Sequence, residues 1–160
     1  MITKVEQKDI RECVEVIRKS FGTVADEFGF TTENAPRFTA FATTEDRIHW
    51  HLSGEHRPMY VYCENGVVVG YYSLLLQDNR ECELNNLSVL PEYRHKGIGK
   101  ELLDHACQKA AELGCARMNI GIVEENEILK KWYAAYGFVH TGTQKFEFFP
   151  FTCGYMNKVL

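Results

Sequence analysis

The fold is decided by the segment Leu87-Ser88-Val89-Leu90-Pro91-Glu92-Tyr93-Arg94-His95-Lys96-Gly97-Ile98-Gly99-Lys100. It begins with the end of an apolar stretch that stops at a proline, a residue that the interior of a strand does not accept. A basic loop follows, and two glycines then open a stretch whose apolar residues repeat at helical spacing as far as Leu113. The segment therefore predicts a strand, a loop and the start of a long helix in direct succession.

The loop has the properties of a pyrophosphate site. The first amides of a helix have no partner within the helix and carry partial positive charge. Gly97 and Gly99 let a ligand approach these amides without a side chain in the way. Four basic side chains surround them, namely Arg94, His95, Lys96 and Lys100. The alternative is a glycine-rich helix start with solvated basic side chains. The Gly-Lys-Ser/Thr of a Walker loop and the third glycine of the dinucleotide fingerprint are both absent.

The wider pattern around the loop carries a family resemblance. Arg-x-x-Gly-x-Gly directly before a helix, after Val-x-Pro-x-Tyr at a strand end, resembles the coenzyme A signature of the GNAT superfamily of N-acetyltransferases. The likeness extends through most of residues 59–141, whereas the first third of the chain matches only in its order of elements. The resemblance implies one α/β (α+β) domain over residues 1–160. Its sheet would be mixed, mostly antiparallel, of six or seven strands, with helices on both faces.

The resemblance also implies a cofactor site and an activity. Main-chain amides from Arg94 to Gly99 would hold the pyrophosphate of coenzyme A, and the backbones of Leu87 and Val89 would pair with its pantetheine arm. The expected cofactor-binding residues are Leu87, Ser88, Val89, Arg94, His95, Lys96, Gly97, Ile98, Gly99, Lys100 and Asn126. The implied reaction is transfer of an acetyl group from acetyl-CoA to a primary amine. The alternatives are a non-catalytic module that senses acyl-CoA and a plain binder of nucleotide phosphates.

Glu83 is the candidate general base. It lies eleven residues before Arg94, on the strand that leads to the loop. A glutamate at that offset commonly takes this role in the resembling family, often through a water. An amine with a lysine-like pKa of about 10.4 needs such a base at neutral pH. Glu81 is the second candidate, and the third interpretation is a solvated strand glutamate without a role.

Tyr133 is the candidate general acid. The pattern Asn-x₆-Tyr-x₃-Gly-Phe, from Asn126 to Phe138, resembles the second conserved block of the family, where the tyrosine hydroxyl reaches the coenzyme A sulfur. Tyr136 is the alternative acid, and a core tyrosine is the structural interpretation. Asn126 is expected either to bond the cofactor arm or to cap its helix.

Periodicity and turn residues predict the remaining elements. The expected strands are 2–5, 59–63, 67–76, 81–90, 117–123, one beginning at 138–141, and 148–160. The expected helices run from Asp9 to Gly22, over 38–52, over 97–113, and from Asn126 to Gly137.

Composition excludes several classes of partner. A net charge of -4 and a pI near 5.9 do not favour general binding to nucleic acid or an anionic membrane. The longest apolar stretch, 67–76, is too short to span a bilayer, and the N-terminus lacks the apolar core of a signal peptide. The six cysteines form no Cys-x-x-Cys pair and are expected to be reduced thiols, which points to the cytoplasm.

The acceptor is expected to be a small-molecule or peptide amine, and the resemblance implies that its recognition lies in residues 23–57 and 144–156. A phenylalanine tract, Phe146 to Phe151, is interpreted as strand packing, as an acceptor pocket or as a dimer contact. The family often forms pairs, so a homodimer is a further implication. His49, His51 and His56 lack the carboxylate or cysteine that would complete a ligand set, and no metal is expected.

Overall fold

The computed structural model describes all residues from Met1 to Leu160. The helices are α1 (Ile10–Phe28), α2 (Thr39–Ala42), α3 (Glu45–His49), α4 (Ile98–Glu112) and α5 (Glu127–Ala135), with short η1 (Gln7–Asp9), η2 (Trp50–Gly54) and η3 (Pro91–Tyr93). The strands are β1 (Ile2–Lys4), β2 (Met59–Glu64), β3 (Val67–Leu76), β4 (Glu81–Val89), β5 (Arg117–Val123), β6 (Val139–Lys145) and β7 (Thr152–Val159).

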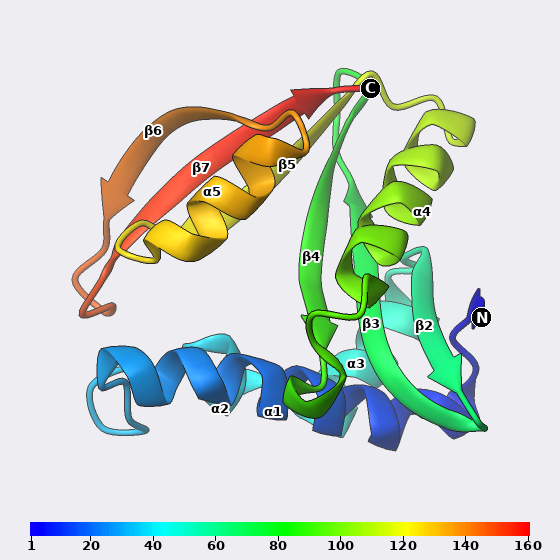
Figure 1. The fold of residues 1–160 in the computed structure, drawn as a ribbon, viewed down its shortest axis with the longest axis horizontal. Coiled ribbons are helices and arrows are strands. Elements are labelled where there is room, and N and C mark those ends of the chain that lie inside the picture. The colour runs from blue at the N-terminus through cyan, green and yellow to red at the C-terminus, as the bar shows by residue number, and fades with distance from the viewer.

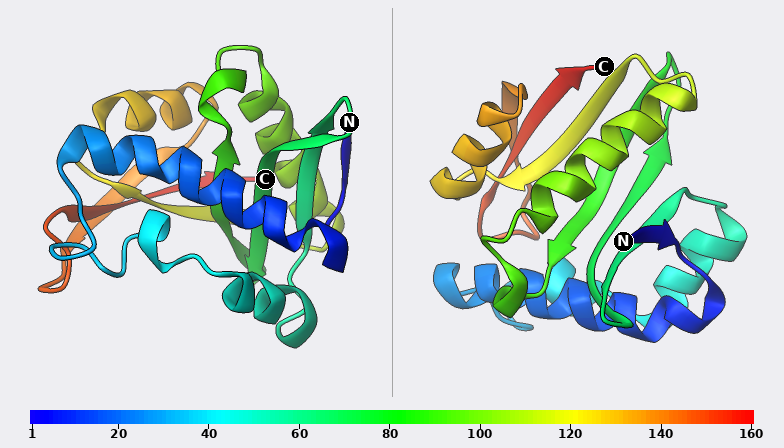
Figure 2. Two further views of the ribbon diagram at one scale, coloured as in Figure 1. Left: turned by 90° about the horizontal axis from the view of Figure 1, so that it is seen from below. Right: turned by 45° about the vertical axis from the view of Figure 1, so that its right-hand side comes forward.

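One seven-stranded sheet runs through the molecule in the order β1-β2-β3-β4-β5-β7-β6, and all neighbours are antiparallel except β4 and β5. Helices α1 and α4 both pack on β3 and β4, from opposite faces (Figures 1 and 2). Successive side chains of β3 point to opposite faces of the sheet. The Tyr72 hydroxyl hydrogen-bonds to His105 Nδ1 of α4 at 2.7 Å, whereas Tyr71 lies near Cys13 of α1. The predicted mixed sheet with helices on both faces is confirmed.

The parallel pair β4 and β5 is joined over only three residues. Glu81, Cys82 and Glu83 pair with Arg117, Met118 and Asn119, and the two strands then separate. β4 continues along β3, and β5 continues along β7. The sheet is therefore split into two arms that diverge from this junction like a V (Figure 1).

An aromatic cluster links α1 and the segment that follows it to the arm formed by β5, β7 and β6. Phe30 and Phe38, which follow α1, contact Phe151 just before β7, with ring centroids 4.9 and 5.7 Å apart. Val123 at the end of β5 completes this second core, which is separate from the main core beneath α1 and α4. The phenylalanine tract thus packs against residues from the first third of the chain.

The structure corrects three predicted boundaries. α1 does not end at Gly22 but continues to Phe28, and Gly29 ends it with a φ of 71°. The single helix predicted over 38–52 is broken, because the Thr44 side chain accepts from the Arg47 amide at 3.2 Å and caps a new helix. The last strand begins at Thr152, since the preceding aromatic residues belong to the cluster. No helix combines the length and the apolar character needed to cross a membrane.

Gly70 sets the distance between β3 and α4. An added Cβ at Gly70 would lie 2.7 Å from Leu102 Cδ1 and 3.3 Å from the Ser88 carbonyl oxygen. We expect Gly70→Ala to lower the free energy of unfolding by about 1–3 kcal/mol, the usual cost of overpacking a core. Denaturant unfolding measures this. Gly22→Ala is the control, since no atom lies within 4 Å of its added Cβ and a helical alanine is favoured. Equal stability of both variants would contradict this account of Gly70.

Candidate functional site

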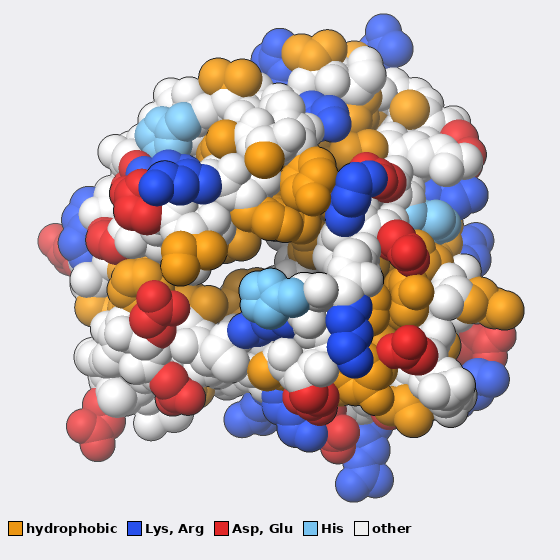
Figure 3. Space-filling view, in the orientation of Figure 1, with side chains coloured by type: hydrophobic (Ala, Val, Ile, Leu, Met, Phe, Trp, Pro, Cys, Tyr) orange, Lys and Arg blue, Asp and Glu red, His pale blue; other side chains and the backbone are white.

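The split between β4 and β5 leaves one edge of β4 without a strand partner. The Leu90 amide donates to the Val69 carbonyl of β3 at 2.8 Å. Because main-chain groups alternate along a strand, those of Leu87 and Val89 point the other way, toward the split. The molecular surface is hollowed between α1 and the arm that carries α5, with apolar and basic side chains at the rim (Figure 3).

A β-bulge interrupts β4 just before this edge. The register with β3 shifts by one residue between Tyr71 and Ser73, opposite Asn86, which has a φ of 54°. The Ser88 hydroxyl donates to the Asn86 carbonyl at 2.7 Å and braces the bulge. The bulge thus lies at Asn86 and Leu87, just before Val89. A bulge turns main-chain amides away from the ladder.

The loop from Arg94 to Gly97 leads directly into α4. His95 and Gly97 have φ of 62° and 86°, which turn the chain sharply before the helix begins at Ile98. No side chain caps α4, and none of the amides from His95 to Lys100 donates to another group of the chain. The Arg94 amide, which was expected to belong to this set, instead donates to the Pro91 carbonyl at 3.3 Å and closes the turn η3. The Cβ position of Gly99 lies 3.5 Å from Trp132 Cζ2, so this side of the helix start faces α5. These amides form an open anion-binding nest beside the split.

The basic side chains around this loop have different surroundings. Arg94 turns toward α1 and donates to Thr23 Oγ1 at 3.0 Å. Lys100 pairs with Asp104 at 2.6 Å, and Lys96 lies over the Tyr93 ring at 5.1 Å. His95 is exposed. The nest is therefore built from the main chain, and the side chain of Arg94 is committed elsewhere.

Glu83 lies at the junction of the two arms, opposite Leu75 and Asn119. It is half-buried, and burial raises the pKa of its carboxyl, an effect that the positive charge of Arg57 partly opposes. Gln77 Nε2 donates to Glu83 Oε2 at 3.4 Å. A half-buried carboxylate with a raised pKa has the properties of a general base.

Glu81, the second candidate, is held differently. Its carboxylate accepts from Asn119 Nδ2 at 3.1 Å, and the same amide nitrogen donates to Gln77 Oε1. The Glu81 carboxylate therefore already accepts a hydrogen bond from the Asn119 side chain of β5. Sequence reasoning missed Gln77 and Asn119, because neither residue type nor spacing marks them.

Tyr133 is almost enclosed, with 6% of its surface exposed. Its ring packs edge-on against Trp132 and Phe138, and burial alone raises the pKa of its phenol, with no hydrogen bond contributing. The hydroxyl is thus protonated throughout the neutral range and available as a donor. Tyr136, the alternative, is more accessible and packs against Trp132.

Asn126 caps α5, since its Oδ1 accepts from the Leu129 amide at 3.2 Å. This agrees with the structural interpretation of that residue. Its Nδ2 makes no hydrogen bond within the chain and can still donate to a ligand. The two interpretations of Asn126 are therefore compatible.

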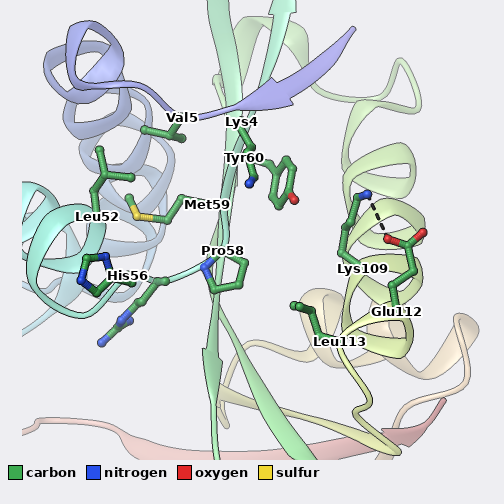
Figure 4. Close-up of a pocket in the computed structure, with 11 residues that line it drawn as sticks. Lys4, Val5, Leu52, His56, Pro58, Met59, Tyr60, Lys109, Glu112 and Leu113 are labelled. Carbon is green, nitrogen blue, oxygen red and sulfur yellow. Dashed lines mark hydrogen bonds and ion pairs between the residues drawn. The ribbon is translucent and has the colours of Figure 1, made fainter.

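A pocket of about 470 Å³ lies away from this site, between β2, η2 and the end of α4 (Figure 4). Lys4, Tyr60 and Lys109 line it, together with His56. Lys109 pairs with Glu112 at 3.0 Å. None of the predicted site residues borders this pocket. No three His, Cys, Asp or Glu side chains cluster as metal ligands do.

Comparison with known proteins gives one consistent result. The model of the acetyltransferase (GNAT) family matches residues 24–138. An uncharacterized N-acetyltransferase of Lactobacillus delbrueckii subsp. lactis is 29% identical over 145 residues, covering 85% of this chain and 82% of the relative. Among solved structures, the PaiA N-acetyltransferase of Thermoplasma acidophilum in complex with coenzyme A shares the fold, with a TM-score of 0.82, 20% identity and coverage of 100% and 98%. A GNAT acetyltransferase of Elizabethkingia anophelis with acetyl-CoA bound gives a TM-score of 0.65 at 22% identity, covering 73% and 84%.

Proposed function

The chain belongs to the acetyltransferase (GNAT) family, and from this premise we propose that it transfers an acetyl group directly from acetyl-CoA to a primary amine. The observation that carries the proposal is the nest of unbonded amides from His95 to Lys100 at the mouth of the split sheet. A diphosphate at these amides would satisfy groups that the fold leaves open. The acceptor is a small molecule or a peptide with a free amine.

A diphosphate bound at the nest determines where the other parts of the cofactor would lie. The pantetheine arm would enter the split and pair with the main chain of Leu87 and Val89, as an added strand does. Asn126 Nδ2 would donate to an amide carbonyl of the arm while its Oδ1 keeps the helix cap. This placement brings the thioester toward Tyr133 and the junction of the two arms.

The chemistry then divides between two side chains. Glu83 takes the proton of the acceptor amine, directly or through a water, because a protonated nitrogen has no lone pair to attack with. The C–N bond forms, and an amide freed by the bulge at Asn86 and Leu87 stabilises the tetrahedral oxyanion. The C–S bond breaks, and the Tyr133 hydroxyl donates its proton to the departing thiolate. The nitrogen loses its second proton to solvent, which returns a proton to Tyr133, and Glu83 releases the proton that it took.

The cysteines favour direct transfer over an acyl-cysteine intermediate. Cys82 is adjacent to Glu83 but fully buried, and burial raises the pKa of its thiol to about 12. A protonated, enclosed thiol is a poor nucleophile. This argues against an acyl intermediate on Cys82 and supports direct attack of the amine on the thioester.

A thermal shift with acetyl-CoA, followed by thiol release against a panel of amines, tests the proposed function. We expect acetyl-CoA to raise the Tm and at least one amine to release free coenzyme A. Stabilisation without release for every amine would favour a module that senses acyl-CoA. Absence of any stabilisation by coenzyme A would contradict both functions.

Glu83→Gln should lower kcat/KM at pH 7 by about 100-fold, the lower range of general-base effects. In the wild type, kcat/KM should rise with pH as Glu83 ionises, around a pKa that burial has raised, and then level off. The variant lacks this limb, so its rate should keep rising toward the pKa of the free amine. pH–rate profiles measure this. Glu81→Gln is the matched control and should retain the wild-type profile, whereas an unaltered profile in Glu83→Gln would remove Glu83 as the base.

Tyr133→Phe should lower kcat by about 100-fold with little change in the KM for acetyl-CoA, as expected for a group that acts in the transition state. The Tyr133 hydroxyl makes no hydrogen bond in the fold, so its removal should not lower the Tm. Steady-state kinetics and thermal unfolding measure the two effects. Tyr136→Phe is the control. If it slows turnover and Tyr133→Phe does not, the acid is Tyr136.

A further inference from the structure

The side chain of Arg94 fastens the start of the loop to α1. Its Nη1 donates to Thr23 Oγ1 at 3.0 Å, and its Nη2 donates to the Ser20 carbonyl at 3.0 Å and to Ser20 Oγ at 3.2 Å. The Thr23 hydroxyl itself donates to the Ser20 carbonyl at 2.8 Å, which orients its lone pair toward the guanidinium. Three bonds from a rigid planar group fix both distance and direction.

This attachment bears on the shape of the nest. Arg94 directly precedes His95, a non-glycine residue with a φ of 62°. A left-handed conformation at such a residue costs about 1–2 kcal/mol and persists only where the surroundings impose it. The nest has no side-chain cap to hold it. The bonds from Arg94 to α1 supply the missing restraint.

We infer that Arg94 is a positioning residue that shapes the diphosphate nest through Ser20 and Thr23 of α1, rather than by contact between its charge and the phosphates. The inference rests on the proposed coenzyme A site. It gives Ser20 and Thr23 an indirect part in cofactor binding, through Arg94, although both belong to a helix outside the loop and to no motif that the sequence analysis singled out.

The turn of α1 that holds Ser20 and Thr23 also contacts the aromatic cluster. Phe21, between the two residues that Arg94 contacts, packs against Phe38 with ring centroids 6.1 Å apart. Phe38 in turn belongs to the aromatic cluster that contains Phe151 and Val123 of the other arm. One turn of α1 therefore contacts the Arg94 side chain on one side and the aromatic cluster on the other.

The rival role is electrostatic. The hydrogen-bond partners of Arg94 are all neutral, and burial lowers the pKa of its guanidinium. An uncompensated cation near the nest would attract a diphosphate from any orientation. In that case the hydroxyls of α1 would not matter, and any cation at residue 94 would serve.

Binding of coenzyme A, measured by isothermal titration calorimetry, distinguishes the two roles. Thr23→Val keeps Arg94 and its charge and removes one acceptor. We expect its Kd to rise about 5- to 10-fold, as for the loss of a hydrogen bond to a charged group. Arg94→Met should raise the Kd further, and Arg94→Lys should not restore it, because an ammonium lacks the fork. The double variant Arg94→Met/Thr23→Val should bind no more weakly than Arg94→Met.

Kinetics and a control complete the test. The KM for acetyl-CoA should rise in Thr23→Val while kcat at saturation stays within about twofold, as for an interaction equal in ground and transition states. Lys19→Met, an exposed change on the same turn of α1, should bind like the wild type. Wild-type affinity in Thr23→Val, or full restoration by Arg94→Lys, would overturn the inference and leave the coenzyme A site intact. If the wild type itself bound no coenzyme A, the proposed function would fail instead.

Discussion

The structure depends on one constraint: beyond Glu83, β4 has a hydrogen-bonding neighbour on one side only. Buried main-chain groups without partners cost about 1–3 kcal/mol each, so a strand edge inside a sheet must meet solvent or a ligand. The separation of β4 from β5 after three residue pairs creates such an edge in the middle of the molecule. The bulge at Asn86, the open nest before α4 and the hollowed surface all lie along it.

A split sheet needs other contacts to hold its two arms. At the junction, Asn119 of β5 donates to Glu81 of β4 and to Gln77. At the open end, Phe30 and Phe38 close against Phe151. Polar groups therefore hold the molecule together at the junction and aromatic rings at the open end, and the surface between them is hollowed.

Sequence reasoning succeeded where a local pattern had a local cause. The apolar stripe and glycines that predicted the helix over 97–113 act within a few residues, and α4 is found at Ile98–Glu112. It failed at Gly22, because the stop signal of a glycine competes with packing of the whole helix, and α1 keeps its core contacts as far as Ala25. The partners of Arg94 were also beyond prediction, since Ser20 and Thr23 lie more than 70 residues away along the chain.

Burial explains how similar residues acquire different proposed roles. Glu81 and Glu83 lie on the same face of β4 and begin with the same carboxyl chemistry. The amide of Asn119 engages Glu81, whereas desolvation at the junction raises the pKa of Glu83. Desolvation also raises the pKa of Tyr133 and keeps its phenol protonated. Exclusion of water thus acts in the same direction on both groups: it raises the pKa of the Glu83 carboxyl and of the Tyr133 phenol, which suits the base and the acid proposed for amine acylation.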